Sequence, residues 1–397
     1  MTSSTLLMSK SLTDYGNTLR EWSTATVRPY ARTADADHAP PSDWRAILAT
    51  CPVPLGEGRG DDLVPVEFED GYWVTKLVAY ENLNYGDIWL QPLLGGGIGY
   101  LVVDSMGTEA QIDRWGSHRV ATQGLMTGFA LTEPHFGSDT SQVSTTATRV
   151  DDRWVLNGSK IYCSCGATAD YVIVFATVDK ALGAKGINAF VVPRGTPGFA
   201  VAKANESKLG LRSWVTSELL FEDCAIPLDH RLGFSDDDLS RQRTSGLGGA
   251  LGALAYNRPN MAATAVGLAQ ASIDLTREQL ADMRPGFTPH RWRRIEDELH
   301  NIDFILDRGR RLNLNAQRLL DAGRPDAGAA AMSKAYTPQT CERIIRRCMQ
   351  LLGPEGSSSD LLLEKWYRDV KIMDIFEGSG QIQRLMVGRA MMGRSVG

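Results

Sequence analysis

The sequence predicts an α+β protein in which a helical segment is followed by a β-rich segment and then by a second helical segment. Apolar residues recur at helical spacing up to about Arg114, short β-branched segments follow from about Leu125, and long helical patterns return after Arg258. Because the strands follow one another without helices between them, they favour a sandwich or barrel-like sheet over a βαβ arrangement. We place the domain boundaries at 1–124, 125–240 and 241–397.

The composition fits a globular protein and argues against several other classes. Of the 397 residues, 43% are hydrophobic and 22% are charged, which is enough to bury a sizeable core. The net charge of -5 argues against nucleic-acid binding. The six cysteines form no CxxC pair and the six histidines show no metal-ligand spacing, so no metal site is expected. No apolar run reaches the roughly 18 residues of a membrane helix and the N-terminus lacks a signal pattern, so we expect a cytoplasmic protein without a membrane span.

The first helical segment is predicted to start at Ser11. Apolar side chains recur every three or four residues from Leu12 to Trp22, which is the spacing of one buried helix face. A Pro- and Gly-rich loop at 52–62 interrupts this composition, and helical character returns from Tyr72.

The middle segment carries the strand signals. Asp151-Asp152-Arg153 and Asn157-Gly158 are predicted to be turns. The strands themselves are predicted at Thr145–Val150, Trp154–Leu156, Tyr171–Val178, Ile187–Val192, Phe199–Ala204 and Ser217–Phe221.

The last segment reads as a set of long helices. Pro259 is predicted in the first turn of a helix, where its missing N–H is harmless, and the almost wholly apolar residues from Met261 to Ile273 indicate a helix buried in a bundle. Further helices are predicted at 295–320 and 329–352, and a final one after Gly378-Ser379-Gly380 with Ile382, Leu385 and Met386 facing inward.

Common catalytic motifs are missing or incomplete. The glycine-rich run Gly95–Gly99 lacks the full GxGxxG pattern, a preceding strand and an acidic partner, so it does not indicate a Rossmann site. The chain has no GxSxG, which removes most of the support for serine hydrolysis.

Two segments are far more specific. Residues Ala130–Asp139 read ALTEPHFGSD and residues Ile375–Arg384 read IFEGSGQIQR. Together they closely resemble the two signature regions of the acyl-CoA dehydrogenase family, and stretches beginning at Asn157, Lys208 and Tyr256 agree in the same order. The resemblance covers about residues 10 to 395. It implies an N-terminal α-helical domain, a middle β-sandwich or barrel-like domain and a C-terminal four-helix bundle, with FAD bound without a Rossmann domain.

The resemblance makes Glu377 the catalytic base. It would remove the α-proton of an acyl thioester while FAD accepts the β-hydride, and the product would be a trans-2-enoyl thioester. A carboxylate in a dry pocket has a raised pKa, which makes it a better base. The alternative interpretation of Glu377 is a cap of the following helix. The family's other base position matches Asn257, whose amide cannot serve as a base.

The resemblance also assigns residues to FAD and to the substrate. Thr132 and Ser164 match residues that hydrogen-bond the flavin ring, and Tyr162 stands where the family often has a tryptophan. Arg284 matches an arginine that reaches the FAD diphosphate of a neighbouring subunit, so a homo-oligomer, a tetramer or a dimer, is expected. The expected cofactor contacts are Phe129, Leu131, Thr132, Gly137, Ser138, Tyr162, Ser164, Arg284, Phe287, Gln350, Gly353, Ser379 and Gln381, and the expected substrate contacts are Ser138, Arg258 and Gly378.

Several alternatives stay open. The thioester is carried either by coenzyme A or by acyl carrier protein, and an electron-transfer flavoprotein is the expected electron acceptor by analogy. Glu377 argues against a flavin oxidase or monooxygenase, because those branches usually lack it. Thr288 and Pro354 depart from the family's FAD motifs and keep a non-catalytic subunit of a heteromer in consideration. Gly97 is expected on a helix lining the acyl end, where a bulky replacement would shift the chain-length preference.

Overall fold

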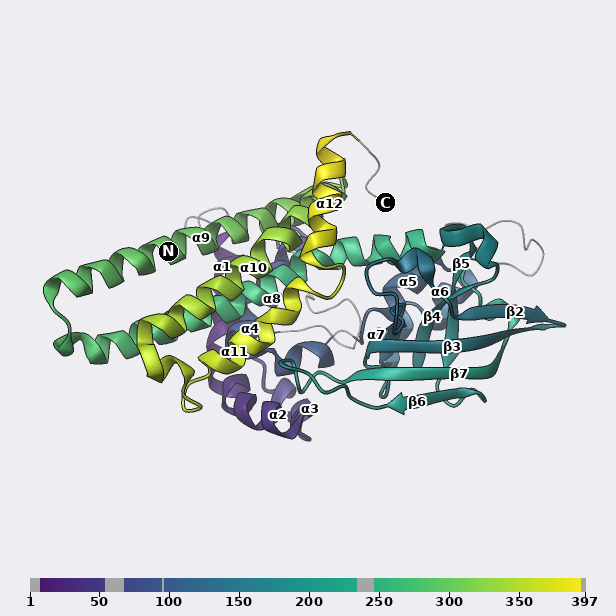
Figure 1. Cartoon of the computed structure of the whole chain (residues 1–397), viewed down its shortest axis with the longest axis horizontal. Helices are drawn as coiled ribbons and strands as arrows, with labels where there is room; N and C mark the ends of the chain where they lie inside the picture. Colours follow the sequence, from purple (N-terminus) through teal and green to yellow (C-terminus); the bar gives the residue numbers. More distant parts are fainter. Residues whose placement is uncertain (1–7, 54–67, 95, 234–245, 394–397) are drawn as a thin grey trace.

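The computed structural model describes residues 8–53, 68–94, 96–233 and 246–393, and it contains helical regions on both sides of the sheet in the sequence. The sheet lies at one end of the long axis, and the hairpin of α8 and α9 extends toward the other end (Figure 1). The predicted α+β class is confirmed.

Helices α1 to α3 pack with α4 in one apolar core, whereas α5 and α6 pack against the sheet. Helix α1 begins one residue after Ser9, whose hydroxyl accepts from the Leu12 N–H at 3.2 Å, so Ser9 and not Ser11 is the cap. Most of the loop predicted at 52–62 lies outside the described residues. The helices are α1 (Lys10–Trp22), α2 (Ala31–Asp37), α3 (Trp44–Ala49), α4 (Tyr72–Gly86), α5 (Gly99–Met106), α6 (Glu109–Trp115) and α7 (Ser117–Gln123), with the 3-10 segment η4 (Ile88–Leu93) before α5.

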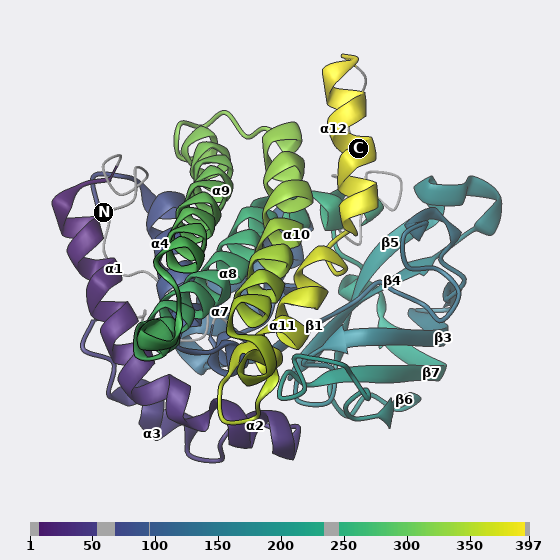
Figure 2. The same ribbon diagram turned by 60° about the vertical axis from the view of Figure 1, so that its left-hand side comes forward.

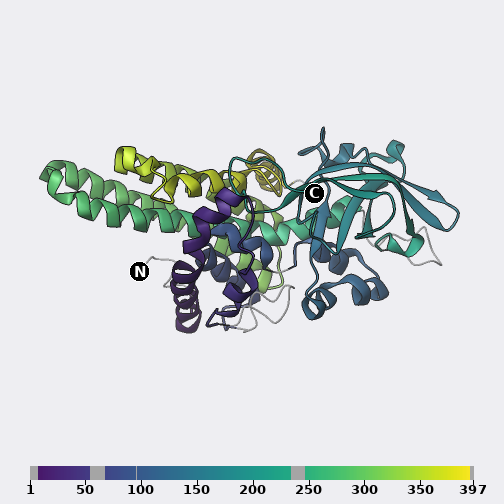
Figure 3. The same ribbon diagram turned by 90° about the horizontal axis from the view of Figure 1, so that it is seen from below.

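The middle region is one curled sheet, as seen from below in Figure 3. Its strands run in the order β1-β4-β2-β3-β7-β6, with β5 paired to β4. The pairs β2–β3 and β3–β7 are antiparallel and β1–β4 is parallel. The strands are β1 (Thr127–Ala130), β2 (Thr146–Val150), β3 (Arg153–Ser164), β4 (Tyr171–Thr177), β5 (Ile187–Pro193), β6 (Phe199–Lys203) and β7 (Thr216–Pro227). All six predicted strands are present, and the two central ones, β3 and β7, are longer than predicted.

The predicted turn at Asn157-Gly158 is wrong, because both residues lie inside β3 at a register shift against β7. Gly158 has a φ of 148°, and a Cβ there would lie 2.6 Å from Thr145 Oγ1. The glycine therefore permits close packing of the backbone at a β-bulge. An Asn-Gly pair at a bulge looks the same in the sequence as an Asn-Gly pair in a turn.

The C-terminal region is built on three long helices that lie side by side in Figure 2, together with α11 and α12. Pro259 lies inside α8 and not in its first turn, because the helix begins well before it. The burial from Met261 to Ile273 is as predicted and holds the helix across the proline, which removes one backbone hydrogen bond. The elements are α8 (Gly246–Met283), α9 (Pro289–Asp321), α10 (Ala327–Leu352), α11 (Leu363–Val370), η10 (Lys371–Asp374) and α12 (Gly380–Met391).

The inward face predicted for α12 is partly wrong. Leu385 is 62% exposed, whereas Gln383 is fully buried. Gln383 faces inward because its carboxamide donates to the carbonyls of Glu377 and Gly378 at 3.4 and 3.1 Å. A polar bond to the preceding loop thus decides the orientation of this helix.

Two glycines at the start of α5 pack against β1: Gly97 before the helix and Gly99 as its first residue. Gly97 has a φ of 82°, and a Cβ there would collide with the Thr127 carbonyl oxygen. A Cβ on Gly99 would lie 2.6 Å from the Gly128 carbonyl oxygen. These contacts give the glycines a packing role, and they remove the basis for the idea that Gly97 widens an acyl cavity.

Gly97→Val is expected to destabilise the fold by about 2 kcal/mol or more, since it combines a left-handed backbone with a steric clash. The midpoint of urea unfolding measures this loss. Gly183→Val is the control, because Gly183 has a φ of 54° but no atom within 4 Å of its Cβ position. Equal losses in the two variants would show that the contact with β1 is unimportant.

Candidate active site

Glu377 lies in the loop between η10 and α12. Glu377 and Gly378 both have left-handed backbones, with φ values of 57° and 88°. A Cβ on Gly378 would collide with Gln383 Nε2, so only glycine fits beside Glu377. Arg258 Nε also donates to the Glu377 carbonyl oxygen at 3.1 Å. The backbone of Glu377 is therefore fixed from α8 and from α12.

The Glu377 carboxylate is held by one oxygen only. Asn257 Nδ2 donates to Oε1 at 2.7 Å, whereas Oε2 is buried and has no hydrogen-bond partner in the described part of the chain. The cap of α12 is Ser379, whose hydroxyl accepts from the Ile382 N–H at 3.5 Å. The capping interpretation of Glu377 thus fails, and Oε2 is free to accept a proton.

Burial raises the pKa of Glu377 above its ordinary value, and three groups oppose that shift. They are the Lys334 ammonium, the Asn257 hydrogen bond and the Arg258 guanidinium. Lys334 on α10 is fully buried, its Nζ finds no hydrogen-bond partner among the described residues, and it lies 5.5 Å above the Phe376 ring. Burial lowers the pKa of Lys334 to about 8, although the nearby carboxylates of Glu377 and Asp374 favour its charged form and partly oppose that shift.

Lys334→Met is expected to move the acidic limb of the kcat/KM profile to higher pH. A base must be deprotonated to act, so its rate rises with pH through its own pKa. Removing a nearby cation raises the pKa of Glu377 and delays that rise. The pH profile of flavin reduction measures the shift. Lys334→Arg keeps the charge and is expected to leave the limb near its original position, and an unmoved limb in Lys334→Met would exclude the electrostatic role.

The first signature region is fastened to β3. The Ile161 N–H donates to the Thr132 carbonyl at 2.9 Å, and Lys160 Nζ donates to the Leu131 carbonyl at 3.1 Å. Lys160 Nζ also contacts Glu133 Oε1 at 2.7 Å in a fully buried ion pair. Burial by itself would raise the pKa of Glu133, but the Lys160 ammonium outweighs it and the pKa is lowered to about 2. Burial disfavours the charged form of Lys160 and lowers its pKa to about 8. Glu133 is thus structural, while Thr132 stays partly accessible.

The loop that carries Glu377 is connected to the end of β3 through Trp214. The Cys165 N–H, next to Ser164, donates to the Val215 carbonyl at 3.0 Å. The Trp214 ring lies 6.2 Å from the Phe376 ring, next to the base. Glu377, Thr132 and Ser164, predicted from distant parts of the sequence, therefore belong to one connected region.

The other predicted residues of this region differ in accessibility. Tyr162 is 61% exposed with a φ of 55°, and Gly137 and Ser138 are exposed. Arg258 is 1% exposed and engaged with Glu377, so its contact with the nucleotide end of CoA stays a prediction. Phe129, Leu131, Gly378 and Ser379 are buried or half-buried, and Gln381 is exposed.

A second group of predicted cofactor residues lies far from Glu377 in the same chain. Arg284 and Phe287 contact Trp292 at the α8–α9 turn, at the far end of the molecule from the sheet (Figure 1). Since α8 rises about 1.5 Å per residue, Asn257 and Arg284 are about 40 Å apart. Gln350, which accepts from Arg347 at 3.2 Å, and Gly353 close α10. The structure does not bring these residues to Thr132 within one chain.

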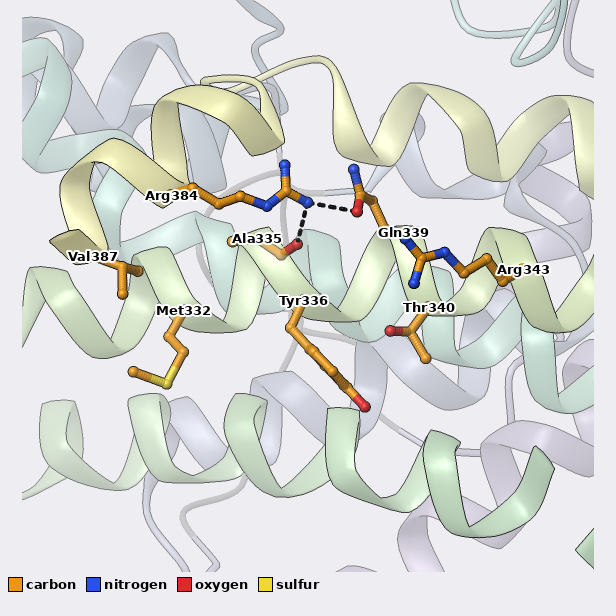
Figure 4. A pocket seen from close by; sticks show the side chains of 8 residues that line it. All are labelled: Met332, Ala335, Tyr336, Gln339, Thr340, Arg343, Arg384 and Val387. Atoms are coloured by element: carbon orange, nitrogen blue, oxygen red, sulfur yellow. Dashed lines mark hydrogen bonds between the residues drawn. The ribbon is translucent and has the colours of Figure 1, made fainter. Parts of the chain in front are cut away.

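A surface groove lies between α10 and α12 (Figure 4). Met332, Tyr336, Arg384 and Val387 are among its lining residues, and Glu377 is not. One lining residue, Gln339, is bonded to the element before Glu377: its Nε2 donates to Asp374 Oδ2 at 3.1 Å. The groove is therefore a surface feature separate from the surroundings of Glu377.

Sequence reasoning missed four polar residues here: Glu133, Lys160, Lys334 and Gln383. A lysine among alanines in the apolar pattern of α10 is a signal that could have indicated Lys334. No local pattern marks the other three, because their partners are fixed only by the fold. Among the described residues, no cluster of three or more histidine, cysteine, aspartate or glutamate side chains is arranged to bind a metal ion. Each described helix is either too short or too polar to span a bilayer.

The site is thus a half-buried carboxylate with one unpaired oxygen, placed between the long C-terminal helices and the curled sheet. Comparison with known proteins identifies the family. Residues 128–224 match the acyl-CoA dehydrogenase middle domain and residues 244–392 match the acyl-CoA dehydrogenase C-terminal domain. The human mitochondrial short-chain specific acyl-CoA dehydrogenase is 36% identical over 385 residues, which cover 93% of this chain and 87% of that enzyme. The chain belongs to the acyl-CoA dehydrogenase family.

Two further comparisons agree. The rat short-chain specific acyl-CoA dehydrogenase is 36% identical over 261 residues, which cover 65% of this chain and 61% of the rat enzyme, less than two thirds of its length. The solved structure of butyryl-CoA dehydrogenase from Megasphaera elsdenii superposes with a TM-score of 0.84 at 27% identity, covering 97% of this chain and 99% of that one.

Proposed function

We propose that this protein catalyses the FAD-dependent α,β-dehydrogenation of an acyl-CoA to a trans-2-enoyl-CoA. The observation that carries the proposal is that Glu377 Oε2 is buried and has no hydrogen-bond partner in the described part of the chain. The other carboxylate oxygen is held by Asn257, and the backbone carbonyl of Glu377 is held by Arg258. The family and its short-chain relatives support the same reaction.

Each polar group around Glu377 then has a distinct part in the reaction. Asn257 orients the carboxylate so that Oε2 takes the α-proton, and Arg258 and Gln383 keep the loop from moving as the charge changes. Lys334 limits how far burial raises the pKa of the base. The N–H of Glu377 polarises the thioester carbonyl, where a developing enolate gains several kcal/mol from a fixed donor.

The residues at the end of β3 suit a flat aromatic cofactor. Tyr162 holds a strained left-handed backbone with an exposed ring, and the Trp214 Nε1 is buried without a partner among the described residues. FAD bound beside Thr132, Tyr162 and Ser164 would supply the acceptor for the hydrogen that leaves the β-carbon. Those three residues would hold it, together with Leu131 and the exposed Gly137–Ser138 loop.

The distance of about 40 Å between Arg284 and Asn257 supports a homo-oligomer. Arg284 can meet a flavin at Thr132 only if the flavin belongs to another copy of the chain. We therefore propose a dimer or tetramer in which Arg284, Phe287, Gln350 and Gly353 complete the cofactor site of a neighbour. An electron-transfer flavoprotein is the proposed acceptor of the electrons.

Anaerobic titration of the purified protein with a panel of acyl-CoAs tests the function. Bleaching of the flavin band is the expected result, and the acyl-CoA that bleaches it best identifies the chain length. A flavin band that only acyl carrier protein thioesters bleach would favour the carrier-protein alternative, which the buried state of Arg258 supports. A protein without flavin would favour the non-catalytic subunit.

A further inference from the structure

A buried ammonium group lies over an aromatic ring one residue before Glu377. Lys334 on α10 is fully buried, and its Nζ has no hydrogen-bond partner in the described part of the chain. The Nζ lies over the Phe376 ring, 5.5 Å from the ring centroid. The face of an aromatic ring carries partial negative charge, so this distance allows a cation–π interaction. The ring therefore offsets part of the hydration that the ammonium loses on burial.

The Phe376 ring has a defined position of its own. The backbone N–H of Phe376 donates to the Ile372 carbonyl at 3.1 Å. The side chain packs against two apolar cores, one that includes Trp366 and one that includes Met261. The Trp214 ring lies 6.2 Å away at an angle of 79°, which is an edge-to-face contact. A lysine side chain is a flexible four-carbon stem, so the ring and not the stem determines where the ammonium rests.

Trp214 is anchored in the loop between β6 and β7. Its backbone N–H donates to the Leu211 carbonyl at 3.0 Å, and its carbonyl accepts from Lys208 Nζ at 2.8 Å. The edge-to-face contact therefore fastens Phe376 from the side of the sheet, whereas Lys334 approaches the ring from α10.

Three charged groups act on the Lys334 ammonium from the surrounding elements. Glu377 and Asp374 favour its charged form, and Arg258 on α8 opposes it. Two of these groups are bonded elsewhere: Asp374 Oδ2 accepts from Gln339, and Arg258 donates to the Glu377 carbonyl. Because none of the three forms a hydrogen bond with Nζ, they act on the ammonium across a distance, whereas Phe376 lies directly beneath it.

We propose that Phe376 is a positioning residue whose ring holds the Lys334 ammonium beside the Glu377 carboxylate. The inference rests on the proposed function, in which Glu377 is the base. When Glu377 takes the α-proton, its carboxylate becomes neutral and Lys334 loses that electrostatic partner. The face of the ring keeps its partial charge before and after the transfer, so it holds the ammonium in both states. Without the ring, the ammonium would move away from Glu377 or lose its proton, and either change raises the pKa of the base.

Changing the charge of the ring at nearly constant size tests the proposal on the holoenzyme. Phe376→3,4,5-trifluorophenylalanine, introduced by amber suppression, withdraws negative charge from the ring face, Phe376→Leu removes the ring, and Phe376→Tyr retains it. The pH profile of anaerobic flavin reduction by an acyl-CoA is measured for each. We expect the trifluoro and leucine variants to move the acidic limb to higher pH by about half a unit, roughly a threefold change in the ionisation constant. The tyrosine variant should keep the limb near its original position.

A double-mutant cycle with Lys334→Met separates the ammonium from other effects of the ring. In the Lys334→Met background, the trifluoro ring is expected to cause no further shift of the limb. The midpoint of urea unfolding is a readout that does not depend on activity: fluorination should lower it when Lys334 is present and leave it unchanged in Lys334→Met. The control is the same fluorination at Phe221, which is 1% exposed and stacks on Phe199 at 5.2 Å, and which should leave the limb in place.

Two results would overturn the inference while the dehydrogenase function stands. An unmoved limb in the trifluoro variant, when Lys334→Met moves it, would mean that the ammonium acts without the ring. A shift that persists in the Lys334→Met background would mean that the ring acts by another route. If Phe376→Leu does not fold, the nearly isosteric trifluoro variant decides between these outcomes. If Glu377→Gln reduces the flavin as fast as the wild type, the proposed function itself fails.

Discussion

Glu377→Gln is expected to lower the rate of flavin reduction by an acyl-CoA by about 10²–10⁴-fold, the usual contribution of a general base. The amide keeps the size of the side chain and can still accept from Asn257, so the loop retains its contacts through Arg258 and Gln383. Only the ability to take a proton at Oε2 is lost. The pre-steady-state rate of flavin bleaching measures the effect, and binding of the product enoyl-CoA measures whether the site is intact.

The matched control is Glu298→Gln on α9. Glu298 accepts from Arg347 Nε at 2.7 Å, is 31% exposed and lies on another surface of the bundle. We expect it to bleach at the wild-type rate. A Glu377→Gln variant that binds enoyl-CoA normally and bleaches as fast as the wild type would remove Glu377 from the chemistry, whatever its position.

How well the elements were predicted depended on whether local patterns alone determine them. Apolar spacing gave α1 and the buried stretch of α8, because one-sided burial leaves a periodic signal. Pro259 and Gly158 were misread for the same reason as each other: a proline inside a helix and a glycine inside a strand look like boundaries. Tertiary packing holds both elements together across these residues, and packing is invisible in a short window.

The candidate site shows the same division. Glu377 was indicated by its signature segment, and Asn257 was noted only as an amide that cannot be a base. The fold gives that amide its role, because the hydrogen bond to Glu377 Oε1 joins residues 120 positions apart in the sequence. The buried Lys334 and the inward-facing Gln383 likewise gain meaning only from the loop that they surround. The sequence therefore indicated which residue to examine, while the orientation of its side chain and the direction of its pKa shift required the structure.

Lys365→Met is expected to destabilise the fold by about 3–5 kcal/mol, the usual loss when a buried charge cluster is left without its cation. Lys365 Nζ lies 2.5 Å from Asp87 and 2.8 Å from Asp369, and none of the three side chains is more than 3% exposed. Asp87 also accepts from Trp366 Nε1 at 2.9 Å, and Asp369 accepts from the Leu211 N–H at 2.7 Å. The cluster therefore ties α11 to η4 and to the loop before β7.

These ties matter for the site, because α11 leads through η10 to the loop of Glu377. Lys371→Met is the control: its bridge to Glu342 is equally short, at 2.8 Å, but Lys371 is 47% exposed, so we expect less than about 1 kcal/mol. Burial already raises the pKa of Asp369, and removing Lys365 raises it further. A carboxyl group whose pKa is raised on folding favours the native state more as the pH falls. The stability deficit of Lys365→Met should therefore shrink from neutral toward acidic pH, and a deficit that grows on acidification would exclude unpaired carboxylates as its cause.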